Sequence, residues 1–211
     1  MEQITEHVFV ETKVRGCNPG FVVTSDGVVL IDPGIDLEFA KKWAKEISKR
    51  GKVRYIINTE HHMDHFVSNS CFDGEIISHE ATRKTMLTMD LNFIRKRSEV
   101  LYIDPLPIPE GYQLRIPNIT YAEHLTLYIG DHTLQLIHTP GHTAGQTSVY
   151  IPEEKVVFTG DNVVGRVRTA WHDALPAKWI ESLKILEKLD FHTIVPGHGE
   201  ICEKDYVGQQ A

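Results

Sequence analysis

An α/β fold is predicted for this chain of 211 residues from three features of its sequence. Runs rich in β-branched residues alternate with helical patterns in the first half, hairpin patterns dominate the second half, and a late helix precedes one more short strand. With 41% hydrophobic and 24% charged residues, the chain is long enough for one sizeable core and short for two. We therefore expect a single domain over residues 1–211.

The first predicted elements are a hairpin, a helix and two further strands. Strand-like runs at 21–24 and 28–31 flank Ser25-Asp26-Gly27, which is a strong turn signal. Asp36 has the features of an N-cap for a helix that continues to about Arg50 and stops at Gly51. Strands at 53–57 and 75–78 follow. The resulting β-α-β order favours parallel pairing around the helix.

An irregular segment, about residues 80–118, is predicted to be a helical and proline-rich insertion. Apolar residues at helical spacing predict a helix from about Glu80 to Arg97. The prolines within 104–109 cannot continue it, because proline lacks an N–H donor and fixes φ. A lid or a dimer surface is one interpretation of this segment, and the other is core packing, which is typical of methionines at helical spacing.

Hairpins and one helix are predicted for the second half. Strands at 125–129 and 133–137 flank Gly130-Asp131, and strands at 147–151 and 156–158 form the next pair. A helix from about Pro176 to Leu189 opens with proline and carries apolar residues on one face. A last strand at 193–195 ends at Pro196-Gly197.

Composition narrows the function classes. A formal net charge of −7 and a pI near 5.9 argue against a broad nucleic-acid or anionic-membrane surface, so we expect a small-molecule substrate, with a homodimer as the one protein partner considered. No run approaches the roughly 20 apolar residues of a membrane span, and no signal peptide is recognised, so a cytoplasmic location is expected. The cysteines have neither the number nor the spacing of a disulfide framework or a thiolate zinc site.

The segment 58–65 has the composition of a metal site at a strand end. It packs three histidines and two carboxylates directly after the strand 53–57. Along an extended backbone, residues two apart face the same way, so Glu60, His62 and Asp64 are expected to converge while His65 reaches in from the turn. One segment can therefore contribute to two metal ions.

Three later strand ends carry a possible ligand beside glycine. His142 follows Pro140-Gly141, Asp161 follows Gly160, and His198 follows Pro196-Gly197. Glycine allows a tight turn and a close backbone approach where a strand must stop and aim a side chain at a shared point. All of these donors are nitrogen or oxygen, which suits zinc, iron or manganese.

Taken together, these motifs resemble those of the metallo-β-lactamase-fold hydrolases, the superfamily that includes glyoxalase II, lactonases and ribonuclease Z. The resemblance covers nearly the whole chain, from Leu30-Ile31-Asp32-Pro33-Gly34 to Pro196-Gly197-His198-Gly199. It implies a four-layer αββα sandwich of two mixed sheets flanked by helices. It also implies two divalent metal ions per chain, with Zn²⁺ favoured and Fe or Mn as alternatives.

The resemblance also assigns ligand roles by position. They are His62 and His142 on the first metal, Asp64, His65 and His198 on the second, and Asp161 between the two. In the family the first motif is His-x-His-x-Asp-His, and Glu60 here replaces its first histidine. The alternative is that His61 is the missing ligand, but on an extended strand it points to the face opposite His62, so Glu60 is favoured. Asp32 is expected to support the motif as a hydrogen-bond acceptor.

The implied activity is hydrolysis by a metal-bridging hydroxide, with Asp64 catalytic because its family counterpart also orients the water. The family often meets its substrate through the loop after Asp161, which makes Arg166, Arg168 and His172 candidate substrate contacts. A guanidinium group is a bidentate partner for a substrate carboxylate.

Several substrates remain open. A small ester, lactone, thioester or amide is expected, with β-lactamase activity or a catalytically silent metal-binding module as alternatives. Glutathione thioesters are less favoured, because the glyoxalase II branch has an extra helical domain and only 13 residues follow His198. Ribonuclease Z requires a basic surface that this chain lacks, and the diiron oxygen reductases carry Glu where His62 stands.

Overall fold

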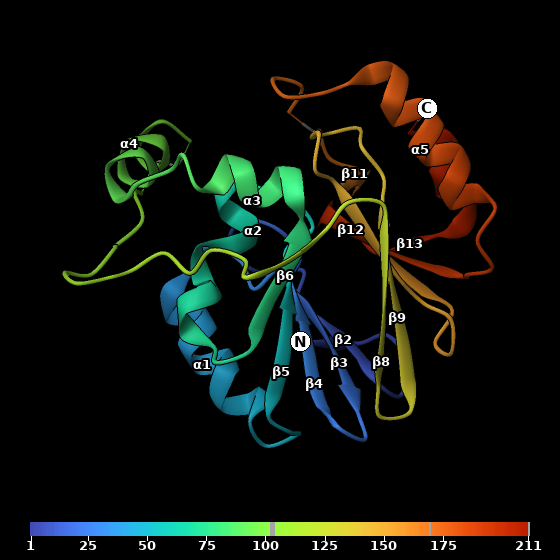
Figure 1. Cartoon of the computed structure of the whole chain (residues 1–211), viewed down its shortest axis with the longest axis horizontal. Coiled ribbons are helices and arrows are strands. Elements are labelled where there is room, and N and C mark those ends of the chain that lie inside the picture. Colours follow the sequence, from blue (N-terminus) through green and yellow to red (C-terminus); the bar gives the residue numbers. More distant parts are fainter. Residues whose placement is uncertain (102–103, 169, 211) are drawn as a thin grey trace.

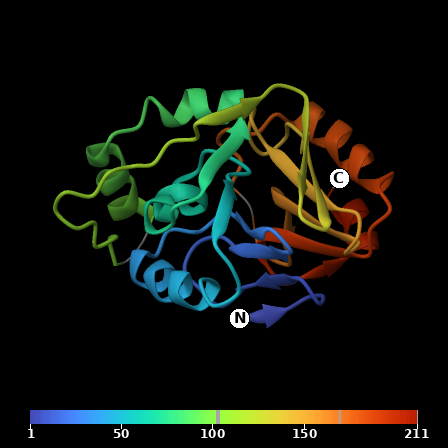
Figure 2. The same cartoon turned by 60° about the horizontal axis from the view of Figure 1, so that its bottom comes forward.

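The computed structural model describes residues 1–101, 104–168 and 170–210. Two β-sheets pack face to face, with helices on their outer faces (Figure 1). The view in Figure 2 shows the same layers from below, with α1 outside the first sheet and α5 outside the second. The predicted four-layer αββα sandwich is therefore confirmed.

The first sheet has seven strands in chain order. They are β1 (Glu2–Gln3), β2 (Val8–Val10), β3 (Gly20–Thr24), β4 (Gly27–Ile31), β5 (Val53–Ile57), β6 (Glu75–His79) and β7 (Ile119–Tyr121). The pairs from β1 to β4 are antiparallel, whereas β4, β5, β6 and β7 pair in parallel. Parallel neighbours require crossovers, and the helices α1 to α4 lie within those crossovers.

The second sheet has six strands in the order β13-β12-β11-β10-β9-β8. They are β8 (His124–Ile129), β9 (His132–His138), β10 (Thr147–Ile151), β11 (Val156–Gly165), β12 (Thr193–Gly199) and β13 (Cys202–Glu203). Among the described residues of this sheet, only β11 and β12 pair in parallel, and α5 connects them. The predicted strand at 156–158 is longer than expected, because its ladder with β12 continues to Gly165 after two register shifts around Gly160.

The helices are short and pack by their apolar faces. They are α1 (Leu37–Ile47), α2 (Met63–Phe66), α3 (Glu80–Met86), α4 (Leu91–Leu101) and α5 (Pro176–Glu187), with 3₁₀ turns η1 (Val67–Cys71) and η2 (Lys204–Gln209). The predicted N-cap is confirmed, since Asp36 Oδ1 accepts hydrogen bonds from the N–H groups of Glu38 and Phe39, each at 3.0 Å.

Three apolar clusters separate the layers. The core between the sheets joins Val22 and Ile57 of the first sheet to Leu136 and Phe158 of the second. Outside the first sheet, Trp43 of α1 belongs to a second cluster. Outside the second sheet, the buried residues of α5 pack on Val157 and its neighbours. These layers fix the strand ends, and hence the side chains that those ends carry.

The predicted single helix over 80–97 is wrong, because the chain forms α3 and α4 with a break between them. Thr88 Oγ1 donates to the carbonyl of Thr85 at 2.7 Å, which satisfies one of the last carbonyls of α3. Asp90 Oδ1 then accepts from the N–H of Phe93 at 2.7 Å and starts a new helix as a cap does.

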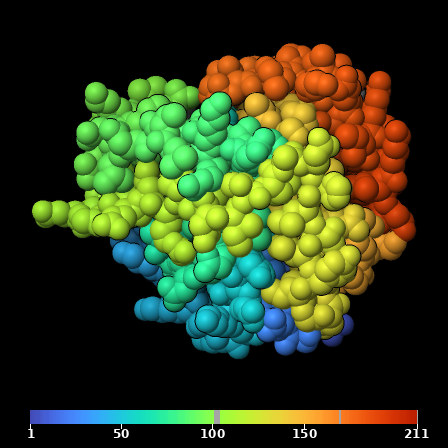
Figure 3. All heavy atoms as spheres, in the orientation of Figure 1, coloured from blue at the N-terminus to red at the C-terminus, as the bar shows by residue number. Residues whose placement is uncertain are grey.

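The segment after α4 crosses the face of the first-sheet half of the molecule, where Figure 3 shows it in yellow-green beside the green helices. Residues 102–103 of the predicted insertion lie outside the described residues. Met86 and Ile94 are fully buried in one cluster with Leu106 and Tyr112. The core-packing interpretation therefore holds for Met86. Within the described part of the chain, no helix is both long and apolar enough to cross a membrane.

Candidate metal centre

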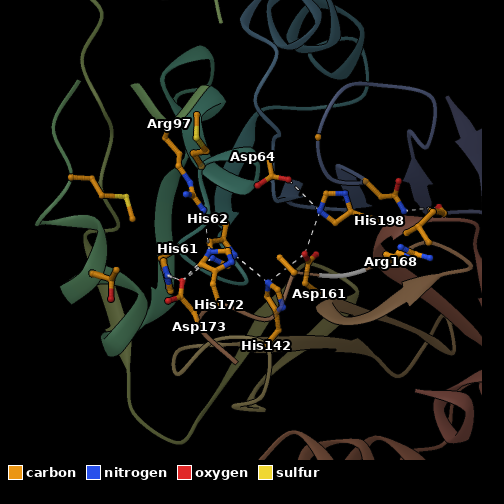
Figure 4. Close-up of a pocket in the computed structure, with 18 of the residues that line it drawn as sticks. His61, His62, Asp64, Arg97, His142, Asp161, Arg168, His172, Asp173 and His198 are labelled. Atoms are coloured by element: carbon orange, nitrogen blue, oxygen red, sulfur yellow. Dashed lines mark hydrogen bonds and ion pairs between the residues drawn. The ribbon is translucent and has the colours of Figure 1, made fainter. Parts of the chain in front are cut away.

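The candidate ligands gather on one side of the molecule, where strands of both sheets end. The segment after β5 supplies Glu60 to His65, and the turn between β9 and β10 supplies His142. Asp161 lies within β11 and His198 within β12. Figure 4 shows Asp161 between His142 on one side and His198 on the other. Residues far apart in the sequence thus converge on one pocket.

The segment 60–65 is not a continuous strand, because β5 ends at Ile57 and the chain bends before α2. His62 has φ −67° and ψ 141°, and α2 begins at the next residue, with the N–H of His65 donating to the carbonyl of His62 at 3.0 Å. The expectation that Asp64 continues an extended strand is therefore wrong. Asp64 and His65 instead project from the first turn of α2 and reach a different side of the pocket from Glu60 and His62.

Glu60, His62 and His142 form a first group of donor atoms. Glu60 Oε2 lies 2.5 Å from His62 Nδ1, and His62 Nδ1 lies 3.2 Å from His142 Nε2. Glu60 Oε1 lies 3.7 Å from His142 Nε2. The structure thus brings together the three residues expected around the first metal.

Asp64, His65 and His198 form a second group. Asp64 Oδ2 lies 3.2 Å from His198 Nε2, and Asp161 lies beside both histidines, with Oδ1 3.4 Å from His65 Nε2 and Oδ2 3.3 Å from His198 Nε2. Asp161 Oδ2 also lies 3.6 Å from His142 Nε2 in the first group. One carboxylate therefore faces both groups, as the resemblance implies.

Glu60 faces both groups as well, which the sequence did not indicate. Its Oε1 lies 3.6 Å from His65 Nε2 and 3.7 Å from His142 Nε2. Glu60 is fully buried. A carboxylate has two oxygens with about four lone-pair sites, so Glu60 can reach a second neighbour where an imidazole in its place offers one donor atom.

Buried polar atoms without hydrogen bonds point into this cluster. Within the described residues, both oxygens of Glu60, Nε2 of His65 and Oδ1 of Asp161 make ion-pair contacts inside the cluster, and no hydrogen bond of good geometry reaches any of them. An unsatisfied buried polar atom costs about 1–3 kcal/mol, and more when it is charged. Four such atoms around one point indicate that a cation belongs there, and nitrogen and oxygen donors fit a divalent transition metal.

The electrostatics of the cluster lead to the same conclusion. Burial disfavours charge on His198, yet the Asp161 and Asp64 carboxylates outweigh burial and raise its pKa to about 10. Burial also disfavours charge on His62, but Glu60 outweighs burial and raises the pKa of His62 to about 9. At Asp161, the neighbouring histidines outweigh burial and hold the pKa of the carboxyl well below its usual range. The carboxylates stay ionised and require adjacent positive charge, which protons or metal ions can supply.

Asp32 supports the second group from behind. Its Oδ2 lies 2.9 Å from His65 Nδ1 and accepts from Thr59 Oγ1 at 2.5 Å, while its Oδ1 accepts from the N–H of Thr59 at 2.8 Å. An acceptor at Nδ1 leaves Nε2 of His65 free to point into the cluster. Asp32 adopts φ +48°, a left-handed conformation uncommon outside glycine.

Close backbone packing and asparagine side chains fix the three ligands on the second sheet. A Cβ added to Gly197 lies 1.9 Å from Asp161 Oδ1, so only glycine allows β12 to approach Asp161 this closely. Asn18 Nδ2 donates to the carbonyls of Pro196 and Gly199, which flank His198, at 3.0 and 2.9 Å. The Asn162 side chain similarly accepts from the N–H of His142 at 2.9 Å.

His61 lies in a different contact from Glu60. Its Nε2 is 3.4 Å from Asp173 Oδ2, and it groups with His62 and Asp173 rather than with His142. Asp173 Oδ2 also lies 3.0 Å from His62 Nε2. The geometry therefore favours Glu60 over His61 as the third donor of the first group.

A cavity of about 800 Å³ opens over the candidate ligands, and Arg168 and His172 both line it. His172 Nε2 lies 3.3 Å from Arg97 Nη2 of α4, so the loop after β11 meets the insertion at the pocket. Arg166 is outside this lining, and its guanidinium pairs with Glu200 at 3.1 Å. Of the three predicted substrate contacts, the structure thus places two at the pocket.

Asp173 and Arg97 are the pocket residues that sequence reasoning missed. Both lie in segments without a motif, and their contacts join residues 111 and 75 positions apart. His172, which precedes Asp173, was a candidate only through the family resemblance. No local pattern in the sequence marks either residue.

Comparison with known proteins gives one family. The model of the metallo-beta-lactamase superfamily matches residues 12–198, which include every candidate ligand. Among solved structures, a metallo-beta-lactamase from Pontibacter korlensis superposes with a TM-score of 0.75 at 20% identity, over 98% of this chain and 94% of the other. At that identity the similarity demonstrates the fold alone.

The curated relatives match this chain over only part of their own length. A hydroxyacylglutathione hydrolase of Mesorhizobium japonicum is 29% identical over 66% of this chain and 46% of its own length. A beta-lactamase-like protein 2 homolog of Caenorhabditis elegans is 25% identical over 92% of this chain and 62% of its own. The chain thus spans about half to two thirds of these two relatives.

Proposed function

Because this chain belongs to the metallo-beta-lactamase superfamily, we propose that it is a dinuclear metal-dependent hydrolase. One observation carries the proposal: two groups of nitrogen and oxygen donors share the Asp161 carboxylate, and they surround buried oxygens without hydrogen bonds. Glu60, His62 and His142 would hold the first ion, Asp64, His65 and His198 the second, and Asp161 both. Zinc is the favoured ion, with iron or manganese as alternatives.

Two divalent ions held by these residues would lower the pKa of a water molecule and would polarise a carbonyl oxygen of the substrate. The protein holds the ligands rigidly, through Asp32 at His65 and Asn162 at the turn of His142. Asp64 lines the pocket as well as contacting His198, so its carboxylate can accept a hydrogen bond from the attacking water and orient it. We therefore assign Asp64 the catalytic role.

The pocket suits a small substrate with apolar and anionic parts. The apolar part of the pocket wall is formed by Met63, Met89, Phe93 and Val167. Two arginines also line the pocket, with Arg97 above His62 and Arg168 near His198 (Figure 4). A concave, mostly apolar cavity with a few polar groups is typical of small-molecule sites. An ester, lactone, thioester or amide with an acidic group fits this arrangement.

Among these bonds, the relatives favour the thioester. Several of the similar curated proteins are hydroxyacylglutathione hydrolases, and hydroxyacylglutathione is a thioester with carboxylate groups. This similarity moves glutathione thioesters forward from their less favoured place in the sequence analysis. The β-lactam alternative is supported by similarity of fold alone. A cytoplasmic location, a homodimer and the lack of a nucleic-acid partner stay predictions.

The decisive experiment combines metal analysis with a substrate panel. We expect the purified protein to contain two metal ions per chain and to hydrolyse one class among ester, lactone, thioester and β-lactam substrates. Asp161→Ala removes the shared carboxylate and should lower the metal content toward one or none, with turnover falling by about 10²-fold or more. Asp190→Ala is the charge-matched control, because it removes an exposed carboxylate between α5 and β12 that pairs with Lys155. Full metal content and unchanged turnover in Asp161→Ala would contradict the dinuclear assignment. If the unmodified protein holds metal but hydrolyses none of the substrates, the catalytically silent module is favoured.

A second experiment tests the anionic part of the substrate. Arg168→Ala should raise KM for an anionic substrate about tenfold, the equivalent of about 1.4 kcal/mol, and leave a neutral analogue nearly unaffected. Arg166→Ala is the matched control, because its guanidinium pairs with Glu200 outside the pocket lining. Equal effects of Arg168→Ala on both substrates would remove the charge-recognition role.

A further inference from the structure

The Asp173 carboxylate is surrounded by imidazoles at the pocket. Its Oδ2 lies 3.0 Å from His62 Nε2 and 3.4 Å from Nε2 of both His61 and His172. Figure 4 shows this carboxylate on the side of His62 away from Asp161. His62 is thus held between two carboxylates, Glu60 at Nδ1 and Asp173 at Nε2.

The contacts of His62 with Glu60 and with Asp173 involve different ring nitrogens and have different roles. A neutral imidazole carries a proton on one nitrogen and a lone pair on the other, and the hydrogen bond at one nitrogen sets the role of the other. An ionised carboxylate only accepts, so Asp173 requires a proton on Nε2. Without a cation, Glu60 Oε2, 2.5 Å from Nδ1, likewise favours a proton there; a metal ion held by Glu60 and His142 would displace that proton, so that the proton stays on Nε2 and the lone pair of Nδ1 is available to the ion.

The fold holds Asp173 in this position. It lies in the loop between β11 and α5, and the N–H of Leu175 donates to the carbonyl of Gly141 at 2.7 Å. That bond ties the loop to the turn that carries His142. The carboxylate is therefore fixed relative to two donors of the first group, His62 and His142.

We propose that Asp173 is a positioning residue that fixes the tautomer and ring orientation of His62, so that Nδ1 faces the first metal ion. This role rests on the proposed metal centre. It extends the centre with an outer carboxylate on the first-metal side, matching the role of Asp32 behind His65 on the second. Outer hydrogen-bond partners of this kind typically account for about 10–100-fold in metal affinity.

The test measures affinity and tautomer in the zinc-loaded protein. Asp173→Ala should weaken one of the two zinc-binding steps by about 10–100-fold in a chelator competition and leave the other step nearly unchanged. Imidazole ¹⁵N spectra should show a proton on Nε2 of His62 in the unmodified protein. In Asp173→Ala the signal of this Nε2–H group should be lost. Asp173→Asn keeps an acceptor oxygen and should retain the Nε2–H signal.

Glu181→Gln is the charge-matched control, because its carboxylate is exposed on α5 and pairs with Lys178 at 2.9 Å. Unchanged zinc affinity with an unchanged His62 signal in Asp173→Ala would overturn the positioning role. Equal weakening of both zinc ions would overturn it too, because His65 and His198 do not contact Asp173. If the unmodified protein binds no metal ion at all, the proposed function itself fails, and the two failures are thereby distinguished.

Discussion

Glu60 gives the first group of donors its particular chemistry. Two imidazoles and one anionic oxygen replace the three imidazoles of the common motif. Its complete burial leaves both oxygens dependent on adjacent positive charge, since their contacts within the described residues are ion pairs with the neighbouring imidazoles. A carboxylate adds negative charge and a harder donor, so this site should accept manganese or iron better than a site of three imidazoles.

Substitution at Glu60 tests this view. Glu60→His should fold and shift the metal preference further toward zinc and away from manganese or iron, measured by competition between equimolar ions. Glu60→Ala should lower the metal content by one ion per chain, while His61→Ala should leave it unchanged, because His61 lies toward Asp173. Loss of metal in the His61 variant alone would make His61 the ligand and Glu60 a hydrogen-bonding neighbour.

Single residues differ in how far their sequence context predicts their place. His142, Asp161 and His198 each directly follow a glycine. For Gly197 this local feature has a physical cause, because the close approach of β12 to Asp161 excludes any side chain there. Asp173 and Arg97 have no such cause. Their contacts with His62 and His172 arise only when distant loops and helices pack together.

Elements were predictable where periodicity alone decides them. The strands at 21–24, 28–31 and 53–57 and the helix capped by Asp36 follow from alternation and capping. The break between α3 and α4 does not, because it depends on hydrogen bonds of Thr88 and Asp90 in a stretch that keeps its apolar spacing. The turn into α2 at Met63 was missed because the preceding strand suggested an extended backbone.

One hydrogen-bonded network joins elements on the side of the molecule away from the candidate metal centre. Glu154, in the turn between β10 and β11, accepts from His132 Nε2 of β9 at 2.9 Å and from His7 Nδ1, beside β2, at 2.8 Å. His132 Nδ1 lies 2.8 Å from Asp131 Oδ1. These contacts tie an antiparallel edge of the first sheet to two hairpins of the second.

This network makes stability depend on pH. Burial opposes charge on His132, but Glu154 and Asp131 outweigh it and raise its pKa above 6.5. A raised histidine pKa stabilises the fold below the unfolded value of 6.5, and that stability is lost as pH rises through the folded value. Burial is also outweighed at Glu154, whose pKa is lowered from 4.5, so its contribution is present above pH 4.5 and lost on further acidification.

We therefore expect His132→Gln to destabilise the protein most between about pH 5 and pH 6, by about 1 kcal/mol or about 2–4 °C in Tm, and less at pH 9. Thermal melts at several pH values measure this difference. His124→Gln, an exposed imidazole at the start of β8, is the control. A destabilisation by His132→Gln that does not vary with pH would contradict the network.

At the scale of the whole molecule, the candidate ligands connect the two halves of the sandwich. Glu60, His62, Asp64 and His65 follow β5 of the first sheet, whereas His142, Asp161 and His198 belong to the second. Bound ions would join the halves at the edge where the carboxylates of both sheets come together. The same carboxylates repel one another when no cation lies between them.

Metal removal should therefore lower the stability of the entire fold. Ions present at about 1,000 times their dissociation constant stabilise a protein by about 4 kcal/mol. Dialysis against a chelator should lower Tm by about 10 °C, and returning zinc should restore it. In Asp161→Ala the chelator should have a smaller effect. Identical melting curves with and without chelator in the unmodified protein would contradict the connection between the halves.

The candidate ligands and the opposite wall of the pocket come from different parts of the chain, and this separation affects how substrate specificity can evolve. The candidate ligands stand on β11, β12, the turn before β10 and the segment from Glu60 into α2. The opposite wall comes from α3, α4 and the link between them, through Thr85, Met89, Phe93 and Arg97. That wall belongs to a segment with its own apolar cluster. Evolution, or an engineer, can therefore exchange this segment for another and alter substrate choice while the inherited chemistry stays intact.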